Sequence, residues 1–241
     1  MIAAEAARDL IVAFPAAGSG GSTLEQLEDL AVRRGLAYVA LSNPGSIDAL
    51  ELGEWHAQSV NGLLQAADRA SATRVIMVGH CMGGLSAIRF GDGLSSRLAL
   101  PVSLLVVNTP CPDASGRIPT MSDFSDAEIA EVLAHDGFPQ DLLDDEDILA
   151  EIADGLRADA TVADRLAAWV ARADDLETLH VLSTRGDHFI PPEKCVGWGN
   201  RVSGEFHLMI TPGGHQIDEA SVGVLERALD AVRACPQTEF A

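Results

Sequence analysis

The stretch that organises this sequence is RVIMVGHCMGG, residues 74–84. Residues 75–78 are apolar and partly β-branched, which predicts a buried strand over 74–78. Glycines then form a turn, and the apolar pattern after it predicts a helix over 83–94. Cys81 therefore lies at the apex of a predicted strand–turn–helix unit.

Cys81 carries the chemistry predicted for this turn. The Gly-x-Cys-x-Gly pattern over 79–83 has the form of a nucleophile elbow, with cysteine where serine is usual. Side chains at Gly79 and Gly83 would collide within such a turn, and the helix N-terminus favours a thiolate. We expect Cys81 to be a nucleophile, the alternative being a small buried cysteine in a tight turn. His80 points another way at such a turn and is interpreted as structural.

The rest of the chain alternates between short apolar runs and segments with helical periodicity. This alternation is typical of an α/β fold, in which helices flank a mostly parallel sheet. Together with the elbow it predicts a single α/β-hydrolase domain over residues 1–241. Strands are expected at 10–14, 37–42, 74–78, 102–108, 179–183 and 205–210. Helices are expected at 23–34, 54–70, 83–94, 192–202 and 217–234.

One long segment, residues 112–175, contains no predicted strand. Helices are expected there at 125–134, 139–156 and 160–173, and Ser125 with Glu128 has the spacing of a capping box. Because the segment follows a strand end that faces the pocket, we expect a helical lid over the carboxyl edge of the sheet. A peripheral helical decoration is the alternative.

A cysteine nucleophile needs a general base and a carboxylate that orients the base. The chain order in this fold is nucleophile, acid, histidine. His215 ends a glycine-rich loop after the sixth strand and is the expected base, with His188 as its competitor. Asp187, in the loop after the fifth strand, is the expected acid. Asp218 is nearer to His215 in sequence but is expected to begin the last helix.

Two backbone N–H groups are expected to form an oxyanion hole. One belongs to Met82, next to the nucleophile, and the other to Ala17, with Ala16 as the substitute. The glycine-rich loop over 14–21 lets N–H groups face the pocket, but its spacing fits neither a P-loop nor a dinucleotide fingerprint.

The composition and the spacing of certain residues argue against some classes of partner and indicate the cellular compartment. A net charge of −20 argues against nucleic acid and against an anionic membrane surface. The start of the chain lacks a signal-peptide pattern, and the longest apolar runs have strand length, so a cytoplasmic protein is expected. The cysteines are far apart and form no C-x-x-C pair, which favours free thiols over disulfides or a zinc site.

These motifs together resemble the type II thioesterases of polyketide and nonribosomal peptide biosynthesis. The resemblance spans nearly the whole chain and rests on the stretches FPAAG (14–18), GHCMGG (79–84), LRAD (156–159), Gly186-Asp187 followed by Trp198, and PGGH (212–215). It implies a substrate held as a thioester on the phosphopantetheine arm of an acyl or peptidyl carrier protein. It also implies a mobile helical lid and no metal or redox cofactor.

The sequence departs from that family at two positions. Gln216 follows the histidine where an aromatic residue is usual, which is expected to reshape the acyl pocket. Cys81 replaces the usual serine, so the enzyme intermediate is a thioester that keeps most of its transfer potential. Some members of the wider group with a cysteine nucleophile shuttle aminoacyl groups between carrier proteins.

The cysteine favours acyl transfer to a second carrier, a peptide or a small molecule through a thiol or an amine. Hydrolysis by an editing type II thioesterase is the nearest alternative. A general small-molecule esterase and a catalytically silent binding protein on a hydrolase fold are the others.

Overall fold

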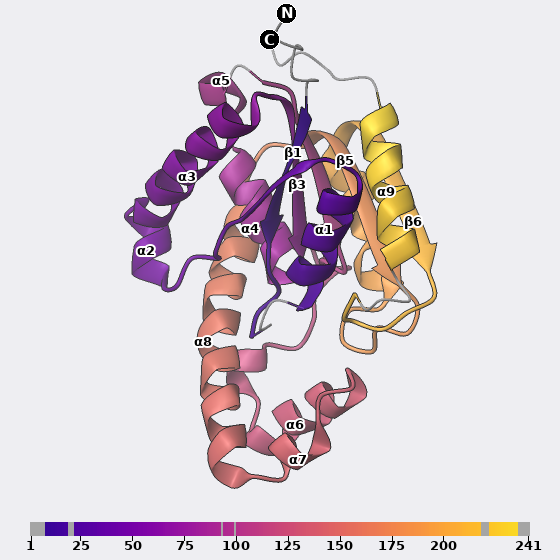
Figure 1. Ribbon diagram of the computed structural model, residues 1–241. Helices are drawn as coiled ribbons and strands as arrows, with labels where there is room; N and C mark the ends of the chain where they lie inside the picture. Colours follow the sequence, from indigo (N-terminus) through magenta and orange to yellow (C-terminus); the bar gives the residue numbers. More distant parts are fainter. Residues whose placement is uncertain (1–7, 19–21, 93, 99, 218–221, 236–241) are drawn as a thin grey trace, which may run out of the picture.

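A computed structural model describes residues 8–18, 22–92, 94–98, 100–217 and 222–235, and its centre is a six-stranded sheet (Figure 1). All neighbouring strands pair in parallel, in the order β2-β1-β3-β4-β5-β6. Each predicted strand is present, so the predicted α/β class is confirmed. The strands are β1 (Arg8–Phe14), β2 (Ala37–Ala40), β3 (Ala72–His80), β4 (Val102–Val107), β5 (Leu176–Thr184) and β6 (Val202–Thr211).

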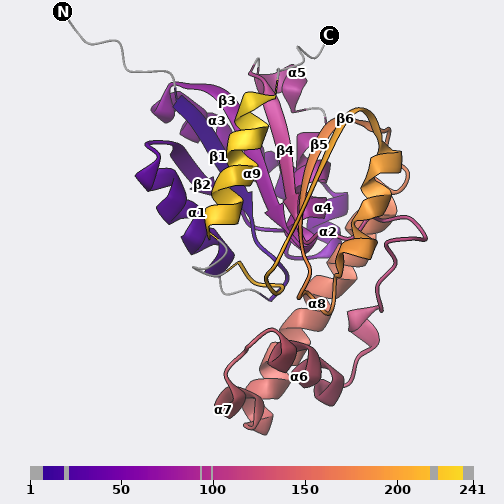
Figure 2. The same ribbon diagram turned by 90° about the vertical axis from the view of Figure 1, so that its right-hand side faces the viewer.

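Helices cover both faces of the sheet (Figures 1 and 2). On one face, α1 (Ser22–Arg33) and α9 (Val222–Ala234) enclose one core cluster with the buried side chains of the sheet. On the other face, α3 (Glu54–Ala70), α4 (Met82–Gly91) and part of α8 (Glu146–Val170) enclose a larger cluster. The first half of the chain also contains two short helices, α2 (Ile47–Glu51) and α5 (Ser95–Leu98). Among the described residues, no helix combines the length and apolar character needed to cross a bilayer.

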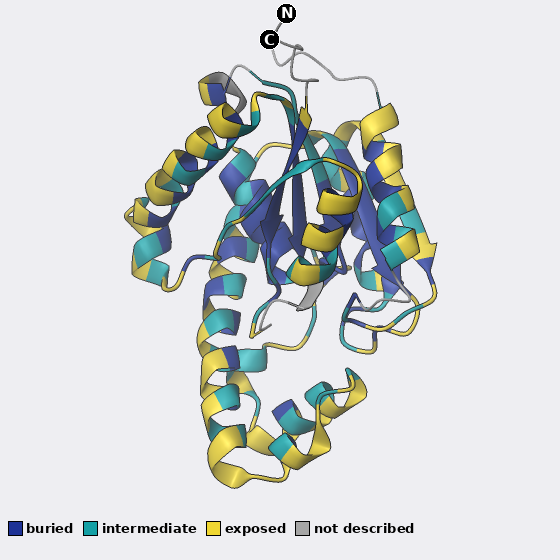
Figure 3. Ribbon diagram, in the orientation of Figure 1, coloured by how far each residue is buried: buried dark blue, intermediate teal, exposed yellow. Residues whose placement is uncertain are grey.

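The segment between β4 and β5 is helical, and part of it lies beyond the carboxyl edge of the sheet (Figure 1). It contains the 3-10 turn η1 (Met121–Asp123), α6 (Asp126–His135), α7 (Gln140–Leu143) and α8. The capping box predicted at Ser125 and Glu128 is present at the start of α6. The first half of α8 forms a small apolar cluster with α6, and its outer surface is exposed (Figure 3). The second half of α8 belongs to the main core, so it anchors the segment to the sheet.

Three helix predictions are wrong in detail. In place of helices at 139–156 and 160–173, the structure has the short α7 and the single long helix α8. Asp145 caps the start of α8, and α8 continues through 157–159 because the residues there favour a helix. Residues 192–202 form the 3-10 helices η2 (Pro192–Lys194) and η3 (Val196–Arg201) instead of an α-helix. Gly197 and Gly199 disfavour an α-helix there, and the Trp198 N–H bonds the Cys195 carbonyl three residues earlier.

The turn between β3 and α4 is held by close backbone contacts. Cys81 has a φ of 54°, and its N–H donates to the carbonyl of Val107 on β4 at 2.8 Å. A Cβ atom at Gly83 would collide with the carbonyl groups of Phe14 and Pro15 at the end of β1. Only glycine therefore allows α4 to begin this close to the sheet.

We expect Gly83→Ala to lower the free energy of unfolding by about 1–3 kcal/mol, because the methyl group overpacks this contact. Gly155→Ala is the matched control, since a Cβ atom at Gly155 on α8 meets no atom within 4 Å. The control is expected to raise stability by about 0.5–1 kcal/mol through its helix propensity. Urea unfolding measures both values, and equal stability of Gly83→Ala and the parent chain would contradict the steric account.

Candidate active site

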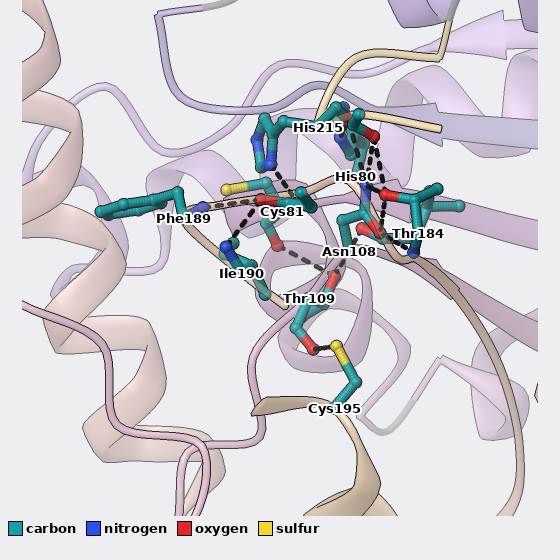
Figure 4. A network of polar contacts seen from close by, with 12 residues as sticks. His80, Cys81, Asn108, Thr109, Thr184, Phe189, Ile190, Cys195 and His215 are labelled. Carbon is teal, nitrogen blue, oxygen red and sulfur yellow. Dashed lines mark hydrogen bonds and ion pairs between the residues drawn. The ribbon is translucent and has the colours of Figure 1, made fainter. Parts of the chain in front are cut away.

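The structure brings the three predicted residues Cys81, His215 and Asp187 together at the carboxyl edge of the sheet, and Figure 4 shows Cys81 beside His215. His215 Nδ1 donates to Asp187 Oδ2 at 2.7 Å, and the His215 and Cys81 side chains lie in the wall of the same pocket. The second carboxylate oxygen of Asp187 accepts the N–H groups of Phe189 and Ile190 at 3.0 and 2.7 Å. The carboxylate of Asp187 is thus fixed on one side by backbone donors and orients His215 with the other.

The surroundings of His215 favour its charged form. Burial by itself lowers the pKa of His215, but hydrogen bonds to Asp187 and Cys81 and the charges of both groups raise it well above 6.5. A positively charged imidazole beside a cysteine is the arrangement that activates the sulfur of a cysteine nucleophile.

The backbone of His215 is held by polar side chains from the ends of three strands. His80 Nε2 donates to the His215 carbonyl at 2.9 Å, and Asn108 Nδ2 donates to the same carbonyl at 3.1 Å. Thr184 donates to the Gly214 carbonyl at 2.7 Å, and its own N–H donates to Asn108 Oδ1. Burial lowers the pKa of His80 to about 3, so this histidine is neutral and serves to position the loop.

Sequence reasoning did not identify Asn108 and Thr184 as part of the site. Both are fully buried polar residues at the carboxyl ends of apolar strands. A polar residue that ends a buried strand needs a partner, and at this edge the partner is the loop that carries His215. A polar residue at the end of an apolar strand was therefore the sequence signal that could have identified Asn108 and Thr184.

The other histidine considered above lies elsewhere. His188 is exposed, and its ring contacts His135 at a centroid distance of 5.1 Å. Asp218 lies outside the described residues. Cys111 and Cys195 are buried, which raises the pKa of their thiols to about 11 and about 12. These two thiols are therefore poor nucleophiles near neutral pH.

A pocket of about 360 Å³ opens beside Cys81 and His215. Apolar side chains from the segment between β4 and β5 form most of its lining, which includes Met121, Ile129 and Leu156. Gln216 lines it too, at the position where the sequence departs from the family pattern. The half-buried Asp136 interrupts this apolar wall, and burial raises the pKa of its carboxyl group. The pocket suits an apolar chain with a polar group at its end.

The two residues expected to supply oxyanion donors lie on the wall of this pocket. Met82 is the first residue of α4, and Ala17 belongs to the loop after β1. The next residue, Gly18, donates its N–H to Asp159 of α8 at 2.8 Å and packs against Leu156. The LRAD stretch of α8 therefore holds the loop that carries Ala17.

We expect Asp187→Asn to lower the pKa of His215, because the variant removes the negative charge and the acceptor at Nδ1. The measurement is a pH titration of the His215 ring by NMR spectroscopy. Asp141→Asn removes the same charge from the exposed surface of α7 and should leave the His215 titration unchanged. An unaltered His215 pKa in Asp187→Asn would contradict the assigned pairing.

Sequence comparison finds relatives of two kinds. Phenyloxazoline synthase MbtB of Mycobacterium tuberculosis is 28% identical over 161 residues, which cover 64% of this chain and 11% of that protein. The chain thus spans about a tenth of the length of that relative. The medium-chain S-acyl fatty acid synthase thioesterase of Rattus norvegicus is 24% identical over 221 residues, covering 85% of this chain and 80% of the relative.

Solved structures share the fold. YbtT, a type II thioesterase from the yersiniabactin NRPS/PKS pathway, superposes with a TM-score of 0.73 at 17% identity, covering 95% of each chain. RedJ, the thioesterase from the prodiginine pathway in Streptomyces coelicolor, superposes with a TM-score of 0.66 at 24% identity over 94% of this chain and 91% of RedJ. Residues 4–234 match the profile described as the Alpha/beta hydrolase family. The predicted fold is confirmed, and the chain belongs to the α/β-hydrolase family.

Proposed function

We propose that this chain is a thioesterase-like acyltransferase of natural-product biosynthesis. It takes an acyl group from the phosphopantetheine thioester of an acyl or peptidyl carrier protein onto Cys81. It then passes the group to a thiol or an amine on a second carrier, a peptide or a small molecule. The observation that carries the proposal is a cysteine at a strained elbow, lying with His215 beside an apolar pocket. The reaction needs no cofactor beyond the arm that the substrate carries, and we place it in the cytoplasm.

In the first half-reaction, the Cys81 thiolate attacks the carbonyl carbon of the carrier thioester while His215 holds the thiol proton. The negative charge moves to the carbonyl oxygen, where the N–H groups of Met82 and Ala17 are proposed to receive it. The carbon–sulfur bond to the carrier arm then breaks, and His215 protonates the leaving thiolate. Asp187 remains ionised and keeps Nδ1 of His215 protonated.

In the second half-reaction, an acceptor thiol or amine occupies the place of the carrier arm. His215 takes its proton, the acceptor attacks the acyl group, and Cys81 leaves as the thiolate. Because the intermediate is a thioester, transfer to another thiol exchanges one thioester for another of similar energy. Water as the acceptor gives hydrolysis by the same steps.

Hydrolysis is the second candidate, and the names of the relatives favour it. The protein from Rattus norvegicus, YbtT and RedJ are all named as thioesterases. Transfer and hydrolysis differ only in the acceptor that attacks the acyl group on Cys81. The buried hydrogen bond between His215 and Asp187, at a pocket that Cys81 also lines, argues against a silent binding protein, which has no need of it.

Three chains mixed with an acyl-loaded carrier and an acceptor thiol test the proposal: the parent, Cys81→Ala and Cys81→Ser. We expect Cys81→Ala to lose acyl loading altogether. Cys81→Ser is expected to lower the ratio of transfer to hydrolysis by about tenfold or more, equivalent to about 1.4 kcal/mol, because its oxoester intermediate is less reactive toward thiols. Chromatography of the free acid and the transferred product gives this ratio. Undiminished turnover by Cys81→Ala would refute the nucleophile, and hydrolysis alone by the parent would favour the second candidate.

A second prediction concerns the loop that carries Ala17. Asp159→Ala removes the acceptor of the Gly18 N–H and should lower the rate of acyl loading by about 10- to 100-fold, below the roughly 10²- to 10³-fold typical of losing an oxyanion donor outright. Alkylation of Cys81 by iodoacetamide needs no oxyanion hole and should be unchanged. Asp154→Ala, which removes an exposed carboxylate from the same helix, is the control. Equal loading rates in the parent, Asp159→Ala and Asp154→Ala would contradict the proposed role of the loop.

A further inference from the structure

A second group of chemically active side chains lies away from Cys81, on the face of the sheet that α9 covers. His180 on β5 and His207 on β6 are paired in register, and their rings stack with centroids 4.5 Å apart at an interplanar angle of 9°. Cys235 follows the end of α9, and its Sγ lies 3.5 Å from His207 Nε2. Ligand atoms of these three residues all lie within 4.8 Å of one another. The sequence did not reveal this group, because its members are separated by 27 and 28 positions.

Glu205 supplies a fourth donor to the same group. Its Oε2 lies 3.3 Å from His207 Nε2 and 2.9 Å from Cys235 Sγ. In a tetrahedral zinc site, with bonds of about 2.0–2.3 Å, neighbouring ligand atoms are about 3.3–3.8 Å apart. The separations from His207 to Cys235 and to Glu205 already match these values. The group therefore has the donor types of a zinc site and two of its separations, and Zn²⁺ would move Cys235 and Glu205 apart from their present 2.9 Å.

His180 provides an independent sign that a ligand is bound here. Its side chain is buried, with an exposed fraction of 4%, and its Nε2 atom has no hydrogen-bond partner. A buried ring nitrogen without a partner is costly, and such atoms are rare in native proteins.

We propose that His180, His207, Cys235 and Glu205 form a zinc-binding site that fastens the end of α9 to β5 and β6. Cys235 donates a hydrogen bond to Glu205. Binding of Zn²⁺ replaces that proton, which passes to solvent, and the thiolate becomes a ligand. No oxidant or reductant takes part.

The surroundings allow the site to form without a large rearrangement. Arg233, two residues before Cys235, pairs with Asp9 at 2.7 Å, and Arg74 pairs with the same carboxylate. These pairs hold the end of α9 against β1 and β3. A cavity of about 400 Å³ is lined by both His180 and Cys235, which gives an ion a path to the buried ring. The end of α9 lies at the edge of the sheet opposite the helical segment (Figure 1).

Cobalt titration of the full chain tests the proposal, in the Cys81→Ala background so that the Cys81–His215 pair cannot bind the metal. We expect one equivalent of Co²⁺ to give a thiolate-to-metal charge-transfer band with the visible bands of tetrahedral Co²⁺. Zn²⁺ should displace it and raise the melting temperature. Adding Cys235→Ser should remove the charge-transfer band. His207→Asn should weaken binding by about tenfold or more, whereas His188→Asn, at an exposed histidine, should leave binding unchanged.

Two results would overturn the site. One is the absence of the cobalt bands in the Cys81→Ala chain. The other is binding that survives Cys235→Ser and His207→Asn with unchanged affinity. Both variants alter surface positions, so folding can be verified by circular dichroism before titration. Cys235→Ser in the parent background should load acyl groups normally, which separates this site from the proposed chemistry at Cys81.

Discussion

The backbone conformation of Cys81 is the constraint on which the rest of the site depends. A non-glycine residue at a φ of 54° is strained by about 1–3 kcal/mol, and the surrounding contacts must maintain it. The hydrogen bond from the Cys81 N–H to Val107 ties the turn to β4, and Gly83 allows α4 to approach the end of β1. With the turn held in this way, the sulfur faces the pocket while the N–H of Met82 begins the helix beside it. A relaxed turn would move the Cys81 sulfur away from the N–H of Met82.

The same edge of the sheet positions the base. His80, Asn108 and Thr184 end three successive strands of the sheet and hold the loop that carries His215. Their hydrogen bonds satisfy buried backbone carbonyl groups, so the loop is fixed by the need to pair polar atoms inside the protein. His215 then meets Asp187 on one side and Cys81 on the other. The same hydrogen bonds therefore stabilise this edge of the sheet and align the reacting groups.

Much of this arrangement could be predicted from the sequence. The alternation of apolar runs with helical segments identified each strand, and the glycines around Cys81 identified the elbow. The order along the chain selected His215 and Asp187, which the structure brings together. The positioning roles of Asn108 and Thr184 could not be predicted, because they depend on which strand ends lie next to the His215 loop. The cysteine spacing favoured free thiols over a zinc site, because the proposed zinc-binding group arises only when two strands and the end of α9 meet.

The central claim is that Cys81 carries the acyl group between donor and acceptor. The most direct measurement is intact-mass spectrometry of the protein, quenched within one turnover after mixing with an acyl-loaded carrier and followed by peptide mapping. The account predicts a mass increase of one acyl group on the peptide that contains Cys81, lost when an acceptor thiol or amine is added. Deacylation of the carrier without an adduct on the protein, or with an adduct on another residue, would contradict it.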